Sequence, residues 1–143
     1  MTARATIHRF RTLTWAERRL LLQAAVLLPL VGAALRPMRL RRVLSLLDAL
    51  AGSASGTAVG ARRTAQVVGW AARYGATRGT CLTRSLTLWC LLRRQRIAAD
   101  LRIGVRREGA FEAHAWIEHD GRVLNDTPDV RERYRLFAEV VAP

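Results

Sequence analysis

The sequence has 143 residues, half of them hydrophobic, which is enough to bury the core of one domain without disulfide or metal staples. Its formal net charge is +13, and all 24 basic residues are arginine. A charge of this size is typical of nucleic-acid-binding proteins, but the arginines are scattered, and no helix-turn-helix, zinc-finger or aromatic-rich RNA-binding signature accompanies them. We therefore expect no nucleic-acid partner and favour an acidic protein or peptide.

The N-terminal third predicts two helices. A capping-box pattern at Thr14 and Glu17 precedes an apolar run from Leu20 to Leu35. At about 16 residues this run is shorter than the ~20 that span a bilayer, and its flanks do not fit a signal peptide. We interpret it as a buried helix or a docking face for a partner, and membrane association is the less favoured alternative. Pro37 ends this helix, and an amphipathic stripe over Met38–Leu50 predicts the next.

A third helix is predicted from Ala58 to Tyr74, after a loop of small residues at 52–56. The loop separates an N-terminal helical region, residues 1–56, from a core that carries the chemistry, residues 57–143. The helical region is a candidate for docking a partner or a membrane. We expect the two regions to form one compact unit.

The next predicted helix, from Thr80 to about Arg96, carries a cysteine at its start. Thr80 suits an N-cap, and leucines follow at helical spacing. Cys81 then lies where free N–H groups and the helix dipole favour a thiolate. We interpret Cys90, in the helix interior, as a packing residue.

The two cysteines are not expected to form a disulfide. Nine residues along one helix separate them by about 13.5 Å, which exceeds the Cα separation of roughly 7 Å that a disulfide allows. Two free thiols suit a reducing cytoplasm, which is the predicted location. The three histidines show no paired ligand spacing, so we predict no metal and no cofactor.

Three short strands are predicted after the cysteine helix, at residues 101–105, 111–118 and 122–126, and the last two form a hairpin. Helices followed by strands predict the α+β class, with a small antiparallel sheet packed on the cysteine helix. Residues 130–141 are ambiguous, although the spacing of Tyr134, Phe137 and Val141 suits a short terminal helix.

The hairpin loop decides whether a histidine and an aspartate meet. A three-residue loop at 119–121, closed by a left-handed Gly121, places His114 directly opposite Asp126 on one face. A two-residue loop at 120–121 would put them on opposite faces. We predict the three-residue loop.

Cys81, His114 and Asp126 together have the chemistry of a cysteine hydrolase. A thiolate attacks a carbonyl, an imidazole carries the proton to the leaving group, and a carboxylate orients the imidazole. Asp126 is the least secure of the three, because an aspartate often begins a turn such as Thr127-Pro128, and Asp129 is its rival.

Five short segments then occur in a recognisable order over about the last two thirds of the chain. They are Cys81-Leu-Thr-Arg-Ser-Leu-Thr-Leu-Trp, Leu-Leu-Arg-Arg-Gln-Arg-Ile97, Leu101-Arg-Ile-Gly-Val105, Ala113-His-Ala-Trp116 and Gly121-Arg-Val-Leu-Asn-Asp126. This succession resembles the peptidase component of lasso-peptide biosynthesis, a family of transglutaminase-like, microcin-processing proteins.

The resemblance implies a papain- or transglutaminase-like fold and a cysteine peptidase that removes the leader from a ribosomally made precursor peptide. The family's Cys, His and Asp fall on Cys81, His114 and Asp126. The resemblance also implies a small, separate leader-binding protein as a partner, and the lasso cyclase is a further candidate partner.

Three more residues are candidates for substrate binding. Arg84 either holds an acidic leader residue or makes a structural salt bridge. Ser85, one turn after Cys81, either lines the cleft or bonds the backbone. Trp116 shares the His114 face and is placed to wall the site. Two other functions stay open: transglutaminase-like acyl transfer to an amine, and a non-catalytic adaptor.

Overall fold

The computed structural model describes residues 12–52, 59–75, 79–106, 109 and 111–140. The elements, in chain order, are α2 (Trp15–Ala34), α3 (Leu40–Gly52), α4 (Ala61–Tyr74), α5 (Cys81–Arg94), β1 (Asp100–Arg106), β2 (Glu112–His119), β3 (Arg122–Val123), α6 (Val130–Arg133) and β4 (Arg135–Val140). The strands form one antiparallel sheet in the order β3-β2-β1-β4. The predicted α+β class is confirmed. Most of the predicted 52–56 loop lies outside the described residues.

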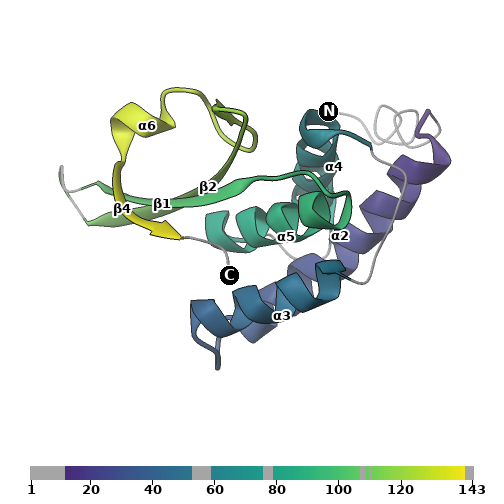
Figure 1. The fold of residues 1–143 in the computed structure, drawn as a ribbon, viewed down its shortest axis with the longest axis horizontal. Coiled ribbons are helices and arrows are strands. Elements are labelled where there is room, and N and C mark those ends of the chain that lie inside the picture. The colour runs from purple at the N-terminus through teal and green to yellow at the C-terminus, as the bar shows by residue number, and fades with distance from the viewer. Residues whose placement is uncertain (1–11, 53–58, 76–78, 107–108, 110, 141–143) are drawn as a thin grey trace.

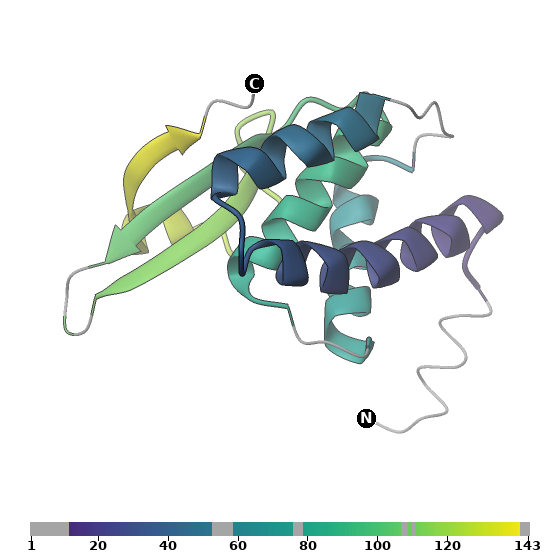
Figure 2. The ribbon, with the colours of Figure 1, turned by 90° about the horizontal axis from the view of Figure 1, so that it is seen from below.

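Helix α5 is the centre of the helical half, and α2, α3 and α4 pack around it (Figure 2). The start of α5 is as predicted, because the Thr80 side chain accepts a hydrogen bond from the N–H of Thr83 at 3.2 Å. From Leu86 to Leu92 every residue is completely buried. The helix ends at Arg94, two residues earlier than expected, and Arg96 follows with a left-handed φ of 59°.

Helix α2 is apolar on both its buried and its exposed face. The predicted capping box is confirmed, since the Thr14 and Glu17 side chains each bond the other's backbone N–H. Leu20 and Leu28 are buried in the core, whereas Leu22 is 68% exposed on the opposite face. Among the described residues, no helix combines the length and apolar character that a bilayer crossing requires.

The β2–β3 hairpin differs from the prediction. Glu118 pairs with Val123, so the loop has two residues, Asp120 and Gly121. Both have positive φ, 48° and 71°, as in the type I′ turn, whose twist matches that of the flanking strands. The predicted three-residue loop is therefore wrong.

The C-terminal segment also differs from the prediction. Only residues 130–133 are helical, and β4 then pairs with β1 as an edge strand of the sheet. The side chains of Leu136 and Phe137 are both exposed. Because neighbouring residues on a strand point to opposite faces, both faces of β4 are open here, and no alternation of apolar and polar residues marked the strand in the sequence.

The sheet has a different covering on each face. Leu101, Ala115 and Ile117 belong to the same core as the helices. On the other face, Trp116 packs with Val130 and Tyr134 from the α6–β4 segment. Figure 1 shows α6 on one side of the strands, with α5 and α3 on the other. His114 stacks on Trp116 and Tyr134 and so lies on this second face, whereas Cys81 belongs to the helix that packs on the first.

Candidate active site

His114 and Asp126 are in contact, although not by the predicted route. His114 Nε2 and Asp126 Oδ2 form a hydrogen bond. If the observed hairpin register continued, Asp126 would face Ala115 and lie on the wrong side of the sheet. However, β3 ends at Val123 and the chain bends over the next three residues. The bend, rather than the strand register, brings the carboxylate to the imidazole.

The side chain of Asn125 holds this bend in place. Its Oδ1 accepts a hydrogen bond from the N–H of Ile117 at 2.8 Å, and its Nδ2 donates to Ser85 Oγ at 2.9 Å. The Ser85 hydroxyl donates in turn to the carbonyl of Ala115 at 2.9 Å. These bonds connect α5, β2 and the residue before Asp126, so they fix where the carboxylate lies.

The Asp126 carboxylate is stabilised in its ionised form. Partial burial acts to raise the pKa of Asp126, but hydrogen bonds from the Thr127 N–H (2.7 Å) and from His114 outweigh burial and hold that pKa below its ordinary value of 3.8. Arg133 Nη2 also donates to Oδ1 of Asp126, at 3.1 Å. An ionised carboxylate can only accept, so His114 donates its Nε2–H to Asp126, and Nδ1 is the ring nitrogen left for another partner.

Two aromatic rings stack on the His114 imidazole. The ring centroid of Tyr134 lies 5.0 Å away and that of Trp116 lies 6.2 Å away. Gly104, which faces His114 across β1 and β2, makes room for both. A Cβ on Gly104 would lie 2.8 Å from Tyr134 Cβ and 3.0 Å from the Trp116 ring, so a side chain there would displace them.

Cys81 starts the helix that is tied to the His114 segment. It lies one turn before Ser85, whose hydroxyl bonds the carbonyl of Ala115, the neighbour of His114. The Cys81 thiol is half-buried, and in the described part of the chain it makes no hydrogen bond with His114. Within the same residues, no group of His, Cys, Asp or Glu is placed to hold a metal ion.

Two of the predicted substrate-binding residues lie beside the site but are buried. Ser85 and Trp116 are both 0% exposed, so neither presents atoms to solvent in this structure, and their role in substrate binding stays a prediction. Ser85 bonds the backbone, which was its alternative role. Arg84 is exposed on the first turn of α5 and forms no ion pair with a described residue, so its substrate role stays a prediction. Asp129 pairs with Arg133 instead of His114.

Three residues of the site were missed in the sequence. No sequence pattern marked Asn125 or Tyr134. Asn125 acts by holding a bend, and Tyr134 reaches His114 across two strands of the sheet. Gly104 did give a signal that could have been used: a glycine inside a strand marks a close approach of another group.

These observations can be compared with known proteins. The model of the transglutaminase-like superfamily matches residues 10–139, and the chain belongs to this superfamily. A stretch of 60 residues is 42% identical to the microcin J25-processing protein McjB of Escherichia coli. The stretch covers 42% of this chain and 28% of McjB, so the similarity spans under a third of that relative. No solved structure matches the chain.

Proposed function

We propose that the chain is a cysteine peptidase that cleaves the leader from a ribosomally made lasso-peptide precursor. The observation that carries this proposal is the hydrogen bond of His114 to Asp126, next to the strand segment to which the Cys81 helix is tied. The similarity to McjB, which is named for processing microcin J25, supports the class of substrate.

In the proposed reaction, His114 exchanges protons through Nδ1, because Asp126 fixes the proton on Nε2. The Cys81 thiol gives its proton to Nδ1, and the sulfur attacks the carbonyl carbon of the leader–core bond. The C–N bond breaks while Nδ1–H protonates the leaving amine of the core. Water then gives a proton to Nδ1, attacks the thioester, and releases the leader as an acid with the thiol restored.

The start of α5 supplies a second element of catalysis. The first N–H groups of a helix have no partner within the helix, and the backbone N–H of Cys81 is one of them. We assign this group as a donor to the oxyanion that forms at the attacked carbonyl.

We further propose that a separate protein recognises the leader. All strands of the described residues belong to the single sheet that carries the site, so none of them forms a leader-binding module beside it. The lasso cyclase is a further candidate partner. Both cysteines are free thiols, and we place the reaction in a reducing cytoplasm.

The experiment is a cleavage assay with precursor peptide and leader-binding protein, analysed by mass spectrometry. We expect one cut at the leader–core junction with the wild type and none with Cys81→Ala. Cys90→Ala is the matched control, because it removes the other thiol by the same substitution and should retain cleavage. Cleavage that survives Cys81→Ala would refute the assignment of the nucleophile.

Acyl transfer to an amine is the second candidate, since the superfamily is transglutaminase-like. The same assay separates the two reactions when an added primary amine is present. Hydrolysis gives a leader with a free carboxylate. Transfer gives a leader that is heavier than this acid by the mass of the amine less one water molecule. A wild type that gives neither product with a validated partner and precursor would favour the non-catalytic adaptor.

A further inference from the structure

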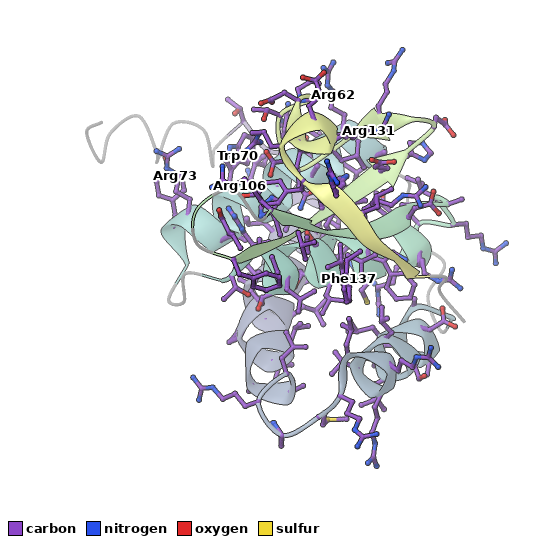
Figure 3. All side chains as sticks on the ribbon, turned by 90° about the vertical axis from the view of Figure 1, so that its left-hand side faces the viewer. Arg62, Trp70, Arg73, Arg106, Arg131 and Phe137 are labelled. Atoms are coloured by element: carbon purple, nitrogen blue, oxygen red, sulfur yellow. The ribbon has the colours of Figure 1, made fainter. Side chains whose placement is uncertain are left out.

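The junction between α6 and β4 touches both members of the His114–Asp126 pair through two consecutive residues. Arg133 contacts Asp126, and Tyr134 contacts His114. Neither residue belongs to the segments that carried the family resemblance. In Figure 3 the α6–β4 segment faces the viewer, with Arg106 of β1 and Arg131 of α6 labelled to either side of it.

Tyr134 is held firmly enough to restrain another ring. It is 4% exposed, and its hydroxyl donates to Glu112 Oε1 at 2.9 Å. Glu112 is also bound by Arg106, at 2.5 Å. The guanidinium groups of Arg106 and Arg133 both lie 5.6 Å from the centre of the Tyr134 ring. The Tyr134 ring, which stacks on His114, is therefore held by a hydrogen bond at its hydroxyl and by the two guanidinium groups over the ring.

Arg133 completes the coordination of the Asp126 carboxylate. His114 takes Oδ2, and Arg133 Nη2 donates to Oδ1 at 3.1 Å and to Thr127 Oγ1 at 3.0 Å. Arg133 Nε pairs with Asp129 at 2.9 Å, which orients the guanidinium. A carboxylate bound at both oxygens cannot rotate without breaking one of these bonds.

We propose that Arg133 and Tyr134 are positioning residues, the 133–134 clamp, which fixes the His114–Asp126 pair in one orientation. Tyr134 stacks on the imidazole and sets its plane, while Arg133 sets the rotation of the carboxylate. The clamp rests on the proposed function for its kinetic consequence, but its geometry does not depend on which bond is cleaved. Neither residue is assigned contact with the substrate.

The kinetic test compares Tyr134→Leu with Tyr134→Phe in the cleavage assay. Loss of the ring should lower kcat by about 10- to 100-fold with KM little changed, because small misplacements of a catalytic group have effects of this size. Tyr134→Phe keeps the ring and should rescue most of the rate. The matched control is Tyr74→Leu, the same change at an exposed tyrosine on the far end of α4.

Arg133 is tested in the same way with Arg133→Gln. We expect a fall in kcat and a displaced acid limb in the pH profile of kcat/KM, since the carboxylate that faces His114 loses a cationic neighbour. Arg133→Lys should recover part of the rate. Arg135→Gln, which removes an equal charge from an exposed residue two positions away, is the control and should match the wild type.

A folded Tyr134→Leu protein with the kcat of the Tyr74→Leu control would overturn the clamp. If Tyr134→Leu does not fold, Gly104→Ala tests the same contact, because its Cβ would push Tyr134 away from the sheet. If the wild type itself does not cleave, the peptidase proposal fails, and the clamp is then tested without activity. The measurement is the NMR chemical shifts of the His114 ring. These signals should shift in Arg133→Gln and in Tyr134→Leu, or in Gly104→Ala if Tyr134→Leu does not fold, but not in Arg135→Gln. Unchanged signals in the first group would overturn the clamp.

Discussion

Two thiols on one helix lie in opposite environments. Cys81 is half-buried at the start of α5, whereas Cys90 is fully buried, with Sγ 3.6 Å from the carbonyl oxygen of Leu47. Burial raises the pKa of Cys90 to about 11. At pH 7.5 a thiol with this pKa is ionised in roughly one molecule in 3,000, so Cys90 is chemically silent in the folded protein.

Alkylation should therefore be selective. We expect iodoacetamide at pH 7.5 to add one group to the native protein, at Cys81, and two groups in denaturant. Peptide mapping by mass spectrometry locates the adducts. Equal labelling of Cys81 and Cys90 under native conditions would show that helix α5 opens, and it would count against the assigned nucleophile.

The contact between His114 and Asp126 could be predicted from the sequence, but the backbone geometry that produces it could not. The sequence suggested both residues, yet it placed them by a strand register that the structure does not have. A two-residue strand followed by a bend cannot be read from side-chain alternation, because only Asn125 and its long-range partners fix the bend. The role of Tyr134 could not be predicted either, because it too depends on contacts between residues distant in sequence.

At the scale of elements, a single hydroxyl joins the cysteine helix to the hairpin. Ser85 Oγ binds the carbonyl of Ala115 on β2 and the amide of Asn125 in the bend. All three groups lie away from water or nearly so. This hydrogen-bonded contact adds to the apolar core that α5 and β2 share, and it is the part that reaches Asn125 in the bend.

The substitution Ser85→Ala should reveal how much this contact contributes to the stability of the fold. It leaves two buried partners without a hydrogen bond, at a cost of about 1–3 kcal/mol in the free energy of unfolding. Ser45→Ala on α3 is the matched control, because its hydroxyl is exposed and bonds only its own helix; it should change stability by less than about 0.5 kcal/mol. Urea unfolding measures both, and equal stability of the two variants would contradict the structural role.

The helices were easier to predict than the strands. Capping signals at Thr14 and Thr80, together with apolar spacing, placed α2 and α5 within a few residues. Strand β4 escaped because it lies at an edge of the sheet, where packing does not impose alternation. Its identity is decided by pairing with β1, a contact between residues 30 to 39 positions apart.

At the scale of the whole molecule, several ion pairs connect elements distant in sequence. Glu17 on α2 binds Arg63 on α4, and Glu118 on β2 binds Arg131 on α6. The hydrogen bond from Arg63, more than any other contact, holds the pKa of Glu17 below its ordinary 4.5. At Glu118 burial opposes ionisation, but the Arg131 and Trp116 hydrogen bonds outweigh it and lower the pKa.

A pH dependence of stability follows from the lowered pKa of Glu17. Because the unfolded chain takes up this proton at higher pH than the folded protein, the stabilisation is complete above about pH 4.5 and is lost as the pH falls below it. Glu17→Gln should lower the free energy of unfolding by about 1–3 kcal/mol at pH 6 and by much less at pH 3. The difference is measured by urea unfolding at both values.

Glu132→Gln is the control for this measurement, since Glu132 is an exposed residue of α6. It should leave the unfolding free energy near that of the wild type at both pH values. Curves for Glu17→Gln that run parallel to the wild type between pH 6 and pH 3 would mean that the Glu17–Arg63 pair does not stabilise the folded chain.

The separation of helices from sheet gives the molecule an electric dipole. The four helices α2 to α5 carry ten arginines and two acidic residues, whereas residues 100–143 carry seven arginines and nine acidic residues. In Figure 1 the α6–β4 segment lies toward one end of the longest axis and α2 reaches toward the other, with α5 and α3 between them on the side of the strands opposite α6. An anionic resin, polymer or protein surface therefore exerts a torque as well as an attraction. Such a surface turns the helices of the protein toward it. The sheet, with His114 and Asp126, then points into free solution.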